Sequence, residues 1–314
     1  MGQSHAINDK LLAGFSRGLF QDESRFINKR IFPEVKSKNL TGKLGSYGKE
    51  SLRIVNSVMG GRGKARQIHV ETTSSDTFII ENHGLSDIIT KEDYANYDLP
   101  FDIESIRTRQ LKTMLMLARE KAMADIINST SIMTKNTTLS GESQWSDYTN
   151  SDPIGDIQTA QASIYDNGGE NPAECIAIMG WHVKNKLRYH PQILENLGFS
   201  RARAGLMSNA ELASALDVSE VLVGTAMYNS SDLGQTDSLS PVWGKHFVLA
   251  YSPKVASLEE NYLGVTVVPA SNAEIVQKTP KSNPPMSKEL VHTMDYDMVL
   301  TDANLGYLAK DVVA

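Results

Sequence analysis

The chain has 314 residues, of which 40% are hydrophobic and 22% charged, and its formal net charge is −6. This length exceeds what one compact core usually holds, so two subdomains are expected. No run of about 18 apolar residues occurs, which argues against a membrane span, and residues 1–20 lack a signal-peptide pattern. The single cysteine, Cys175, excludes disulfides and cysteine-based metal sites within one copy, and its apolar neighbours predict a buried thiol.

Positive charge is concentrated near the N-terminus. Residues 25–70 contain eleven Lys and Arg, and their only acids are Glu34 and Glu50, so this segment carries +9 in a chain that is acidic as a whole. A small soluble enzyme rarely concentrates its charge in this way. The pattern indicates a basic extension that lies on an acidic surface, either nucleic acid or another copy of the chain.

The first 80 residues predict an arm followed by a long hairpin. Two short apolar-periodic pieces, 11–20 and 26–32, indicate helical fragments that Pro33 ends. Residues 67–72 alternate apolar and polar side chains, and Thr77–Ile80 continues the strand after a polar turn. Gly60–Lys64 supplies a flexible tip. An isolated two-stranded hairpin is marginal in water, so we expect this hairpin to lie on another surface.

A long helix is predicted from about residue 101 to residue 129. Asp102 and Glu104 occupy its first turn, where carboxylates favour the helix dipole. Its length of roughly 40 Å, at about 1.5 Å per residue, suggests a spine. One expected face of the helix consists of Ile103, Ile106, Gln110, Met114, Leu117 and Lys121, and Met116, Met123 and Ile127 widen its apolar surface. Residues 131–151 then predict a polar loop.

Residues 150–275 predict a mixed α/β unit of ordinary domain size. Cys175–Met179 is expected to be a buried strand, and the helix that begins at Trp181 to end before Pro191. Ser208 and Glu211 form a capping box that opens a helix through Leu216. The other expected elements are a helix at 157–164 and strands at 221–223, 247–251 and 265–268. A linker is expected at 278–288, and the strands at 292–300 and 305–313 are expected to join the spine helix in a second domain.

No catalytic or metal-binding pattern is convincing. Ser16 lies in a Gly-x-Ser-x-Gly string, but a nucleophile elbow needs a strand before it and a helix after it. Gly60–Lys64 lacks the Ser or Thr of a phosphate-binding loop, since Ala65 takes that place. The seven histidines lack metal-ligand spacing, and Asp295 and Asp297 fit a solvated face or a subunit contact better than a metal site. The sequence therefore predicts a protein that is not an enzyme and needs no cofactor.

The order of these parts resembles the tailed-bacteriophage major capsid proteins of the HK97-fold family. One stretch that carries the resemblance is Gly45–Arg53, with the Gly-rich tip and the return at Thr77–Leu85. The similarity covers nearly the whole chain, but it is one of pattern and order. The other stretches that carry it are Cys175–Gly180, Trp181–Pro191, Asn209–Leu216, Val221–Tyr228, Val242–Gly244 with Leu249–Tyr251, and Asp302–Leu308.

The resemblance implies an α+β, HK97-like capsid fold. Residues 1–31 would form an N-terminal arm and 32–80 the extended β-hairpin, or E-loop. Residues 81–151 and 281–314 would form a peripheral domain with the spine helix at 101–129, and 152–280 the axial domain, whose tips meet at capsomer centres. No residues place the crosslink known in the family's type member, so Lys43, Lys49 and Lys64 are not assigned to one. No N-terminal scaffolding segment is seen before the arm.

The implied function is structural. The chain would assemble with itself into pentamers and hexamers of an icosahedral shell around packaged phage dsDNA. It would be found in the virion, after assembly in the host cytoplasm. A scaffolding protein, a portal and a cement or decoration protein are further expected partners, the dsDNA contact being non-specific, and no membrane is involved. The candidate subunit-contact residues are Arg25, Lys29, Arg30, Lys49, Arg53, Arg62, Lys64 and Arg66.

Three other functions remain open at this stage. A nucleic-acid-binding protein would explain the basic segment and would bind DNA with steep salt dependence. An encapsulin-like nanocompartment shell would share the fold, although such chains usually begin with a helix tucked inside. A hydrolase would depend on Ser16 alone.

Overall fold

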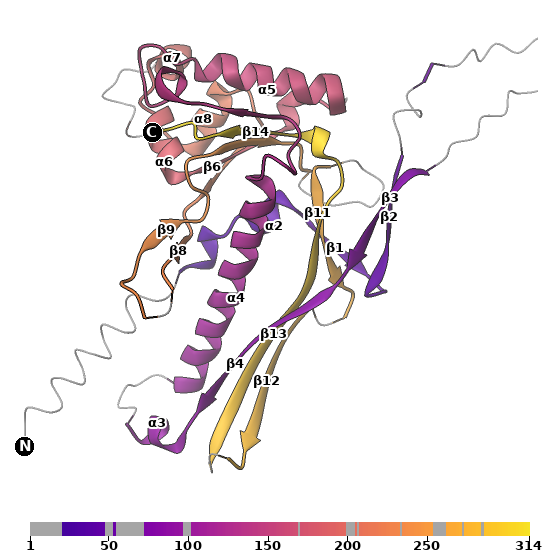
Figure 1. Cartoon of the computed structure of the whole chain (residues 1–314), viewed down its shortest axis with the longest axis vertical. Helices are drawn as coiled ribbons and strands as arrows, with labels where there is room; N and C mark the ends of the chain where they lie inside the picture. Colours follow the sequence, from indigo (N-terminus) through magenta and orange to yellow (C-terminus); the bar gives the residue numbers. More distant parts are fainter. Residues whose placement is uncertain are drawn as a thin grey trace, which may run out of the picture.

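The computed structural model describes residues 21–47, 53–54, 72–96, 102–168, 170–198, 205, 207–232, 234–253, 262–271, 273–283 and 286–314. The expectations for Ser16 and for the hairpin tip at 60–64 lie outside these residues. The described part has two main bodies, an axial body of helices on a sheet and a long peripheral sheet crossed by one helix (Figure 1).

The spine helix is α4 (Ile103–Ile127). It begins where predicted, because the Asp102 carboxylate accepts hydrogen bonds from the backbone N–H groups of Glu104 and Ser105. The predicted stripe was wrong in part, since Met114 is 51% exposed. The buried face also includes the charged pair Arg119 and Glu120, which apolar periodicity does not detect. The apolar residues of the buried face are Ile103, Leu111, Leu115, Met123, Ala124 and Ile127.

The peripheral sheet is organised by the long strand β13 (Ser287–Leu300). The first part of β13 pairs antiparallel with both β12 (Glu274–Lys281) and β4 (Glu81–Ile89), and the last part pairs with β11 (Gly264–Pro269). β1 (Glu34–Ser37) adds a parallel edge to β11. The predicted linker at 278–288 is therefore wrong, because this segment is the end of one hairpin, in which Lys278 pairs with Leu290.

The axial sheet has the strand order β5-β14-β10-β6-β7. Its strands are β5 (Asn136–Thr138), β14 (Gly306–Lys310), β10 (Phe247–Ala250), β6 (Ile176–Gly180) and β7 (Glu220–Gly224). This order corrects two expectations. β14 lies in the axial sheet and not beside β13, whereas β11 lies in the peripheral sheet and not in the axial one. The expected domains, 152–280 on one side and 81–151 with 281–314 on the other, therefore do not coincide with the two bodies, because the chain crosses between the bodies more often.

Helices cover one face of the axial sheet. They are α5 (Pro153–Gly168), α6 (Trp181–Leu187), α7 (Pro191–Asn196) and α8 (Asn209–Ala215). Their apolar sides form one buried cluster with Met179 of β6, Phe247 of β10 and Cys175, which directly precedes β6. The capping box predicted at Ser208 and Glu211 is present at the start of α8. Cys175 is buried as predicted, and burial raises the pKa of its thiol to about 12.

The other face of the axial sheet packs on the end of α4 and on the N-terminal arm. Met123 and Ile127 of α4 meet Ile31 and Phe32 in a second buried cluster, which also contains Trp243. Within the arm, a 3₁₀ turn η1 (Glu23–Arg25) precedes α2 (Asn28–Ile31). Among the described helices, none is long and apolar enough to cross a membrane.

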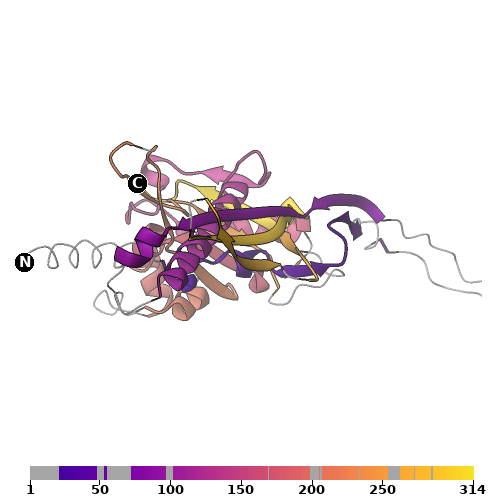
Figure 2. The ribbon, with the colours of Figure 1, turned by 90° about the horizontal axis from the view of Figure 1, so that it is seen from below.

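Three smaller elements project from these bodies. β2 (Thr41–Tyr47) and β3 (Thr72–Ile79) form a separate two-stranded hairpin, which extends to one side of the molecule (Figure 2). β8 (Met227–Asn229) and β9 (Leu239–Pro241) form a second, shorter hairpin. The short helix α3 (Lys91–Asn96) lies beyond the start of α4, at the far end of the peripheral sheet (Figure 1).

Candidate subunit-contact surface

The hairpin β2–β3 is anchored to its own subunit at its base. Phe78 is buried in a small cluster with Tyr262, Val265 and Val267. Its ring lies so close to Gly42 that a Cβ there would approach within 2.7 Å. The backbone N–H of Ile79 also donates to the Asp297 carboxylate at 2.8 Å. This anchor fixes the direction in which the hairpin leaves the peripheral sheet.

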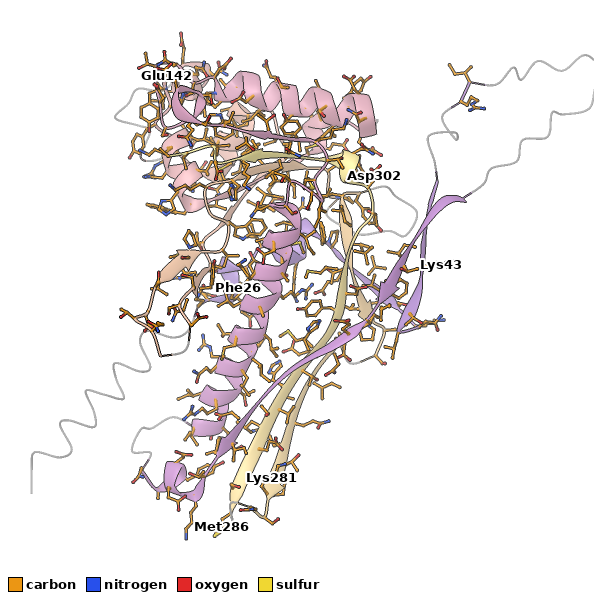
Figure 3. All side chains as sticks on the ribbon, in the orientation of Figure 1. Phe26, Lys43, Glu142, Lys281, Met286 and Asp302 are labelled. Atoms are coloured by element: carbon orange, nitrogen blue, oxygen red, sulfur yellow. The ribbon has the colours of Figure 1, made fainter. Side chains whose placement is uncertain are left out.

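Beyond Phe78, the exposed side chains of the hairpin include Thr41 and Thr77, whereas Leu44 is half-buried against the base cluster. Lys43 lies on the projecting part of β2, away from both sheets (Figure 3), and is exposed. Ile54, in the segment that joins the two strands, is 99% exposed. Within the described part of the chain, β2 pairs with β3 alone. A two-stranded hairpin without a third strand is marginal by itself in water, which favours a second surface for it to lie on.

The described part of the arm, residues 21–31, is in contrast held firmly against its own subunit. The buried Glu120 carboxylate accepts hydrogen bonds from the backbone N–H groups of Ile27 at 3.1 Å and Asn28 at 3.0 Å. It also accepts from the Asn28 side-chain amide at 2.7 Å and from Trp243 Nε1 at 2.7 Å. One side chain of α4 therefore joins the arm to the axial body.

Two ion pairs reinforce this attachment. The buried Arg119 guanidinium contacts the Glu34 carboxylate at 2.9 Å and lies over the Tyr296 ring, 4.9 Å from its centroid. Lys112 of α4 contacts Glu23 of the arm at 2.7 Å. The hydrogen bond from Lys112 lowers the pKa of the Glu23 carboxyl group. Sequence reasoning missed Glu120 and Arg119, because charged residues are excluded from an apolar stripe.

The predicted contact residues fall into two groups. Arg25 is exposed at the end of η1. Lys29 lies 3.6 Å from the Glu34 carboxylate. Arg30 is turned toward its own subunit, where its guanidinium contacts Glu220 at 2.9 Å and donates to the Ser252 carbonyl at 3.0 Å. The structure brings these three together on the arm, and a contact of theirs with another subunit stays a prediction.

The second group belongs to the hairpin. Arg53 is exposed beside Ile54. Lys49, Arg62, Lys64 and Arg66 lie outside the described residues. The structure therefore places the attachment of the hairpin and the direction in which it projects, while the role of these cations remains a prediction from charge.

Three of the residues weighed as metal ligands, His190, Asp295 and Asp297, have structural partners. His190 is buried, and its Nε2 lies 3.1 Å from Ser151 Oγ, whereas His182 is exposed. Asp295 accepts a hydrogen bond from the Asn82 amide, and Asp297 accepts one from the backbone N–H of Ile79 at the base of the hairpin. Among the described residues, no group of three or more His, Cys, Asp or Glu is arranged to hold a metal ion.

Comparison with known proteins identifies the class. No family model matches the chain. It is 26% identical over 249 residues to a protein named major capsid protein of Burkholderia phage BcepMu, covering 79% of this chain and 77% of that one. A crystal structure of a phage-related protein from Bordetella bronchiseptica superposes with a TM-score of 0.68 at 24% identity, over 97% of both chains. The capsid of cyanophage P-SCSP1u superposes with a TM-score of 0.62 at 10% identity, over 94% and 91%.

The fold is that of the HK97-like shell proteins, α+β with a spine helix, a peripheral sheet, an axial body and a projecting hairpin. Within this class, the sequence relatives place the chain with the major capsid proteins of phages. Its role is structural, as a subunit of the virion capsid that assembles with its own copies into a shell.

Proposed function

We propose that this chain builds pentamers and hexamers of its shell by laying the hairpin and its basic segment across a neighbouring copy. The observation that carries this proposal is the hairpin itself, which is anchored through Phe78 at its base and displays Ile54 in full beyond it. A contact of this kind joins two different surfaces, so repeating it around an axis closes a ring.

In this proposal, charge selects the surface of the neighbouring copy on which the hairpin lies, and burial of apolar side chains strengthens the contact. Residues 25–70 carry a strong positive charge, whereas the rest of the chain is acidic. Each exposed ion pair contributes only about 0–1 kcal/mol, so the pairs alone cannot hold a shell together. The same segment also contains Leu52, Ile54, Val55 and Ile68. Obligate interfaces bury roughly 2,000–5,000 Å², which such side chains can help to supply.

The test reverses three cations near the predicted tip. We expect R62E/K64E/R66E to leave the subunit folded, with an unchanged thermal unfolding midpoint, and to impair shell formation in negative-stain micrographs. A control with the same charge change, K91E/K135E/K245E, alters cations outside residues 25–70. Normal shells from the first variant, or an equal loss of shells in both variants, would contradict the proposed role of the basic segment.

The same proposal includes the packaged DNA and the other proteins of the particle as partners. The shell would enclose phage dsDNA without sequence-specific contacts, because the chain outside residues 25–70 is acidic and repels phosphate. A scaffolding protein, a portal and a cement protein would act during or after assembly. The chain would have no catalytic activity and use no cofactor, since its known relatives are named for a structural role.

Two other functions are less well supported. One is an encapsulin-like nanocompartment shell. The likeness found to a virus-like particle from Pyrococcus furiosus, with a TM-score of 0.51 at 10% identity, shows a shared fold alone. A function as a soluble nucleic-acid-binding protein depends on the basic segment. Filter binding of the unassembled chain to dsDNA at increasing salt would reveal that function through a steep loss of affinity.

A further inference from the structure

The helix α6 carries an unusual cationic stripe. Trp181, Lys184 and Arg188 are spaced three and four residues apart, so they lie along one side of the helix and its C-cap. Trp181 is 52% exposed. Within the described part of the chain, neither Lys184 nor Arg188 contacts a carboxylate. The Arg188 Nε is buried without a hydrogen-bond acceptor, although the guanidinium lies over the Tyr189 ring.

This stripe is electrostatically unfavourable in the isolated subunit. Partial burial and the positive charge of Arg188 lower the pKa of Lys184. Two cations one helical turn apart repel each other, and a buried guanidinium N–H without an acceptor adds to the cost. A carboxylate supplied from outside the subunit would relieve both effects.

Negative charge lies at the opposite end of β6, the strand that α6 follows. Glu174 comes shortly before β6, and Trp181 follows it directly. Asp166, Glu170 and Glu174 gather around the C-terminal end of α5, where the helix dipole is also negative. Asp166 and Glu174 are exposed. The whole stretch from 136 to 183 contains seven acids and no Lys or Arg.

The two charged surfaces face different ways. Gly168, at the end of α5, lies against Leu305. This end of α5 stands beside Asp302, on the side of the axial body from which the hairpin projects, and α6 lies on the other side (Figures 1 and 3). The five residues of β6 separate them by about 15 Å at about 3.3 Å per residue.

We propose that the axial bodies of neighbouring copies meet head to tail, with the Trp181–Lys184–Arg188 stripe of one copy docked on Asp166, Glu170 and Glu174 of the next. This inference rests on the proposed function, because it assigns a second contact to the same rings. The occupant is another copy of the chain, since each copy carries both complementary surfaces. Trp and Arg are also the residue types most often found as interface anchors.

The test exchanges charge on each surface separately. K184E/R188E makes both surfaces acidic, and D166K/E174K makes the acidic end basic. Each variant alone then places like charges in every contact, and we expect the subunit concentration needed for shell assembly to rise about tenfold or more. The chain with all four changes restores opposite charges at each contact and is expected to form closed shells again.

A mixture of the two double variants gives a sharper result. Opposite charges then meet only where the variants alternate, and strict alternation closes only rings with an even number of subunits. We expect hexamers, and sheets or tubes built from them, but no pentamers and therefore no closed shells. Negative-stain microscopy and native mass spectrometry would distinguish these products.

The controls are K186E, on the opposite side of α6, and E142K, in the same lysine-free stretch but on the loop before α5. Both are expected to assemble as the unaltered chain does. Folded double variants that assemble normally, or a fourfold variant that folds but does not recover, would overturn this contact. If the unaltered chain forms no shell with or without scaffold, the proposed function itself fails.

Crosslinking of the unaltered protein covers the case in which a variant does not fold. Shells assembled from ¹⁴N and ¹⁵N copies are treated with a carbodiimide, which joins an amine to a nearby carboxylate. We expect Lys184 of one isotope linked to Asp166, Glu170 or Glu174 of the other. Shells in which Lys184 stays unmodified, or links only within its own copy, would contradict the contact.

Discussion

Glu120 is a fully buried carboxylate whose charge is met by N–H donors of three residues. Two of these residues belong to the arm and the third is Trp243 of the axial body. Hydrogen bonds to a charged group contribute more than neutral ones, and a buried donor that loses its acceptor carries the full desolvation cost. This residue therefore decides whether the arm stays attached to the spine helix.

The Glu120→Ala variant tests this role. It leaves the N–H groups of Ile27, Asn28 and Trp243 without an acceptor, so we expect the free energy of unfolding to fall by about 3 kcal/mol. Trypsin should also cleave the arm faster near Lys29. The control is Glu23→Ala, which removes a more exposed ion pair with Lys112 worth about 0–1 kcal/mol. Equal effects of the two changes on urea unfolding would contradict the assignment.

Glu104 is the second carboxylate with a structural role. Hydrogen bonds from Lys288 at 2.6 Å, Tyr94 at 2.7 Å and Lys278 at 2.9 Å lower the pKa of its carboxyl group to about 2. Burial, together with the hydrogen bond to Glu104, raises the pKa of the Tyr94 hydroxyl to about 12. Glu104 thus ties the start of α4 to α3 and to the β12–β13 hairpin.

This pKa shift makes the stability of the fold depend on pH. A carboxyl group whose pKa is lower in the folded chain than its ordinary 4.5 stabilises the fold above that value. The contribution is lost as the pH falls toward about 2. We therefore expect Glu104→Gln to be less stable than the unaltered chain at neutral pH, and the difference to shrink between about pH 5 and about pH 2. Urea unfolding of the unassembled chain at several pH values measures this difference, and a constant gap would contradict the shift.

At the scale of elements, the hairpin is separable from the rest of the fold. Its described strands pair with each other, and its base is held by Phe78. In the proposed assembly, the joining element is therefore one that contributes little to the stability of the subunit beyond that base. A two-stranded hairpin buries little of its own surface, so it would remain available for the proposed contact with a neighbour.

A shortened hairpin separates folding from assembly. Tyr47 pairs with Thr72, so residues 48–71 can be replaced by an Asn-Gly turn that suits a two-residue hairpin connection. We expect the shortened chain to keep its thermal unfolding midpoint within a few degrees and to form no shells. Sedimentation velocity with electron microscopy provides the measurement. Intact shells from this chain would show that the hairpin is not the joining element.

At the scale of the whole molecule, charge is distributed in a direction that suits rings. The hairpin β2–β3 projects on one side, the acidic end of α5 lies on that side, and the cationic stripe of α6 lies on the other (Figure 1). A molecule with unlike surfaces on its two sides assembles head to tail, and head-to-tail contacts close when the rotation between copies divides a full turn. One fold can thereby form both five-membered and six-membered rings.

The sequence alone determined the local structure and the class of function. Asp102 predicted where α4 begins, the apolar run after Cys175 predicted a buried strand, and the Ser208–Glu211 box predicted the start of α8, since each signal acts over a few residues. The concentration of lysine and arginine predicted an extension that lies on an acidic surface, either nucleic acid or another copy, and this contact stays a prediction. Only the tertiary structure decided that β11 lies in the peripheral sheet and β14 in the axial sheet, and that Arg119 and Glu120 face inward. Strand partners and buried charges depend on groups far away along the chain, such as Trp243 for Glu120, and no local pattern records them.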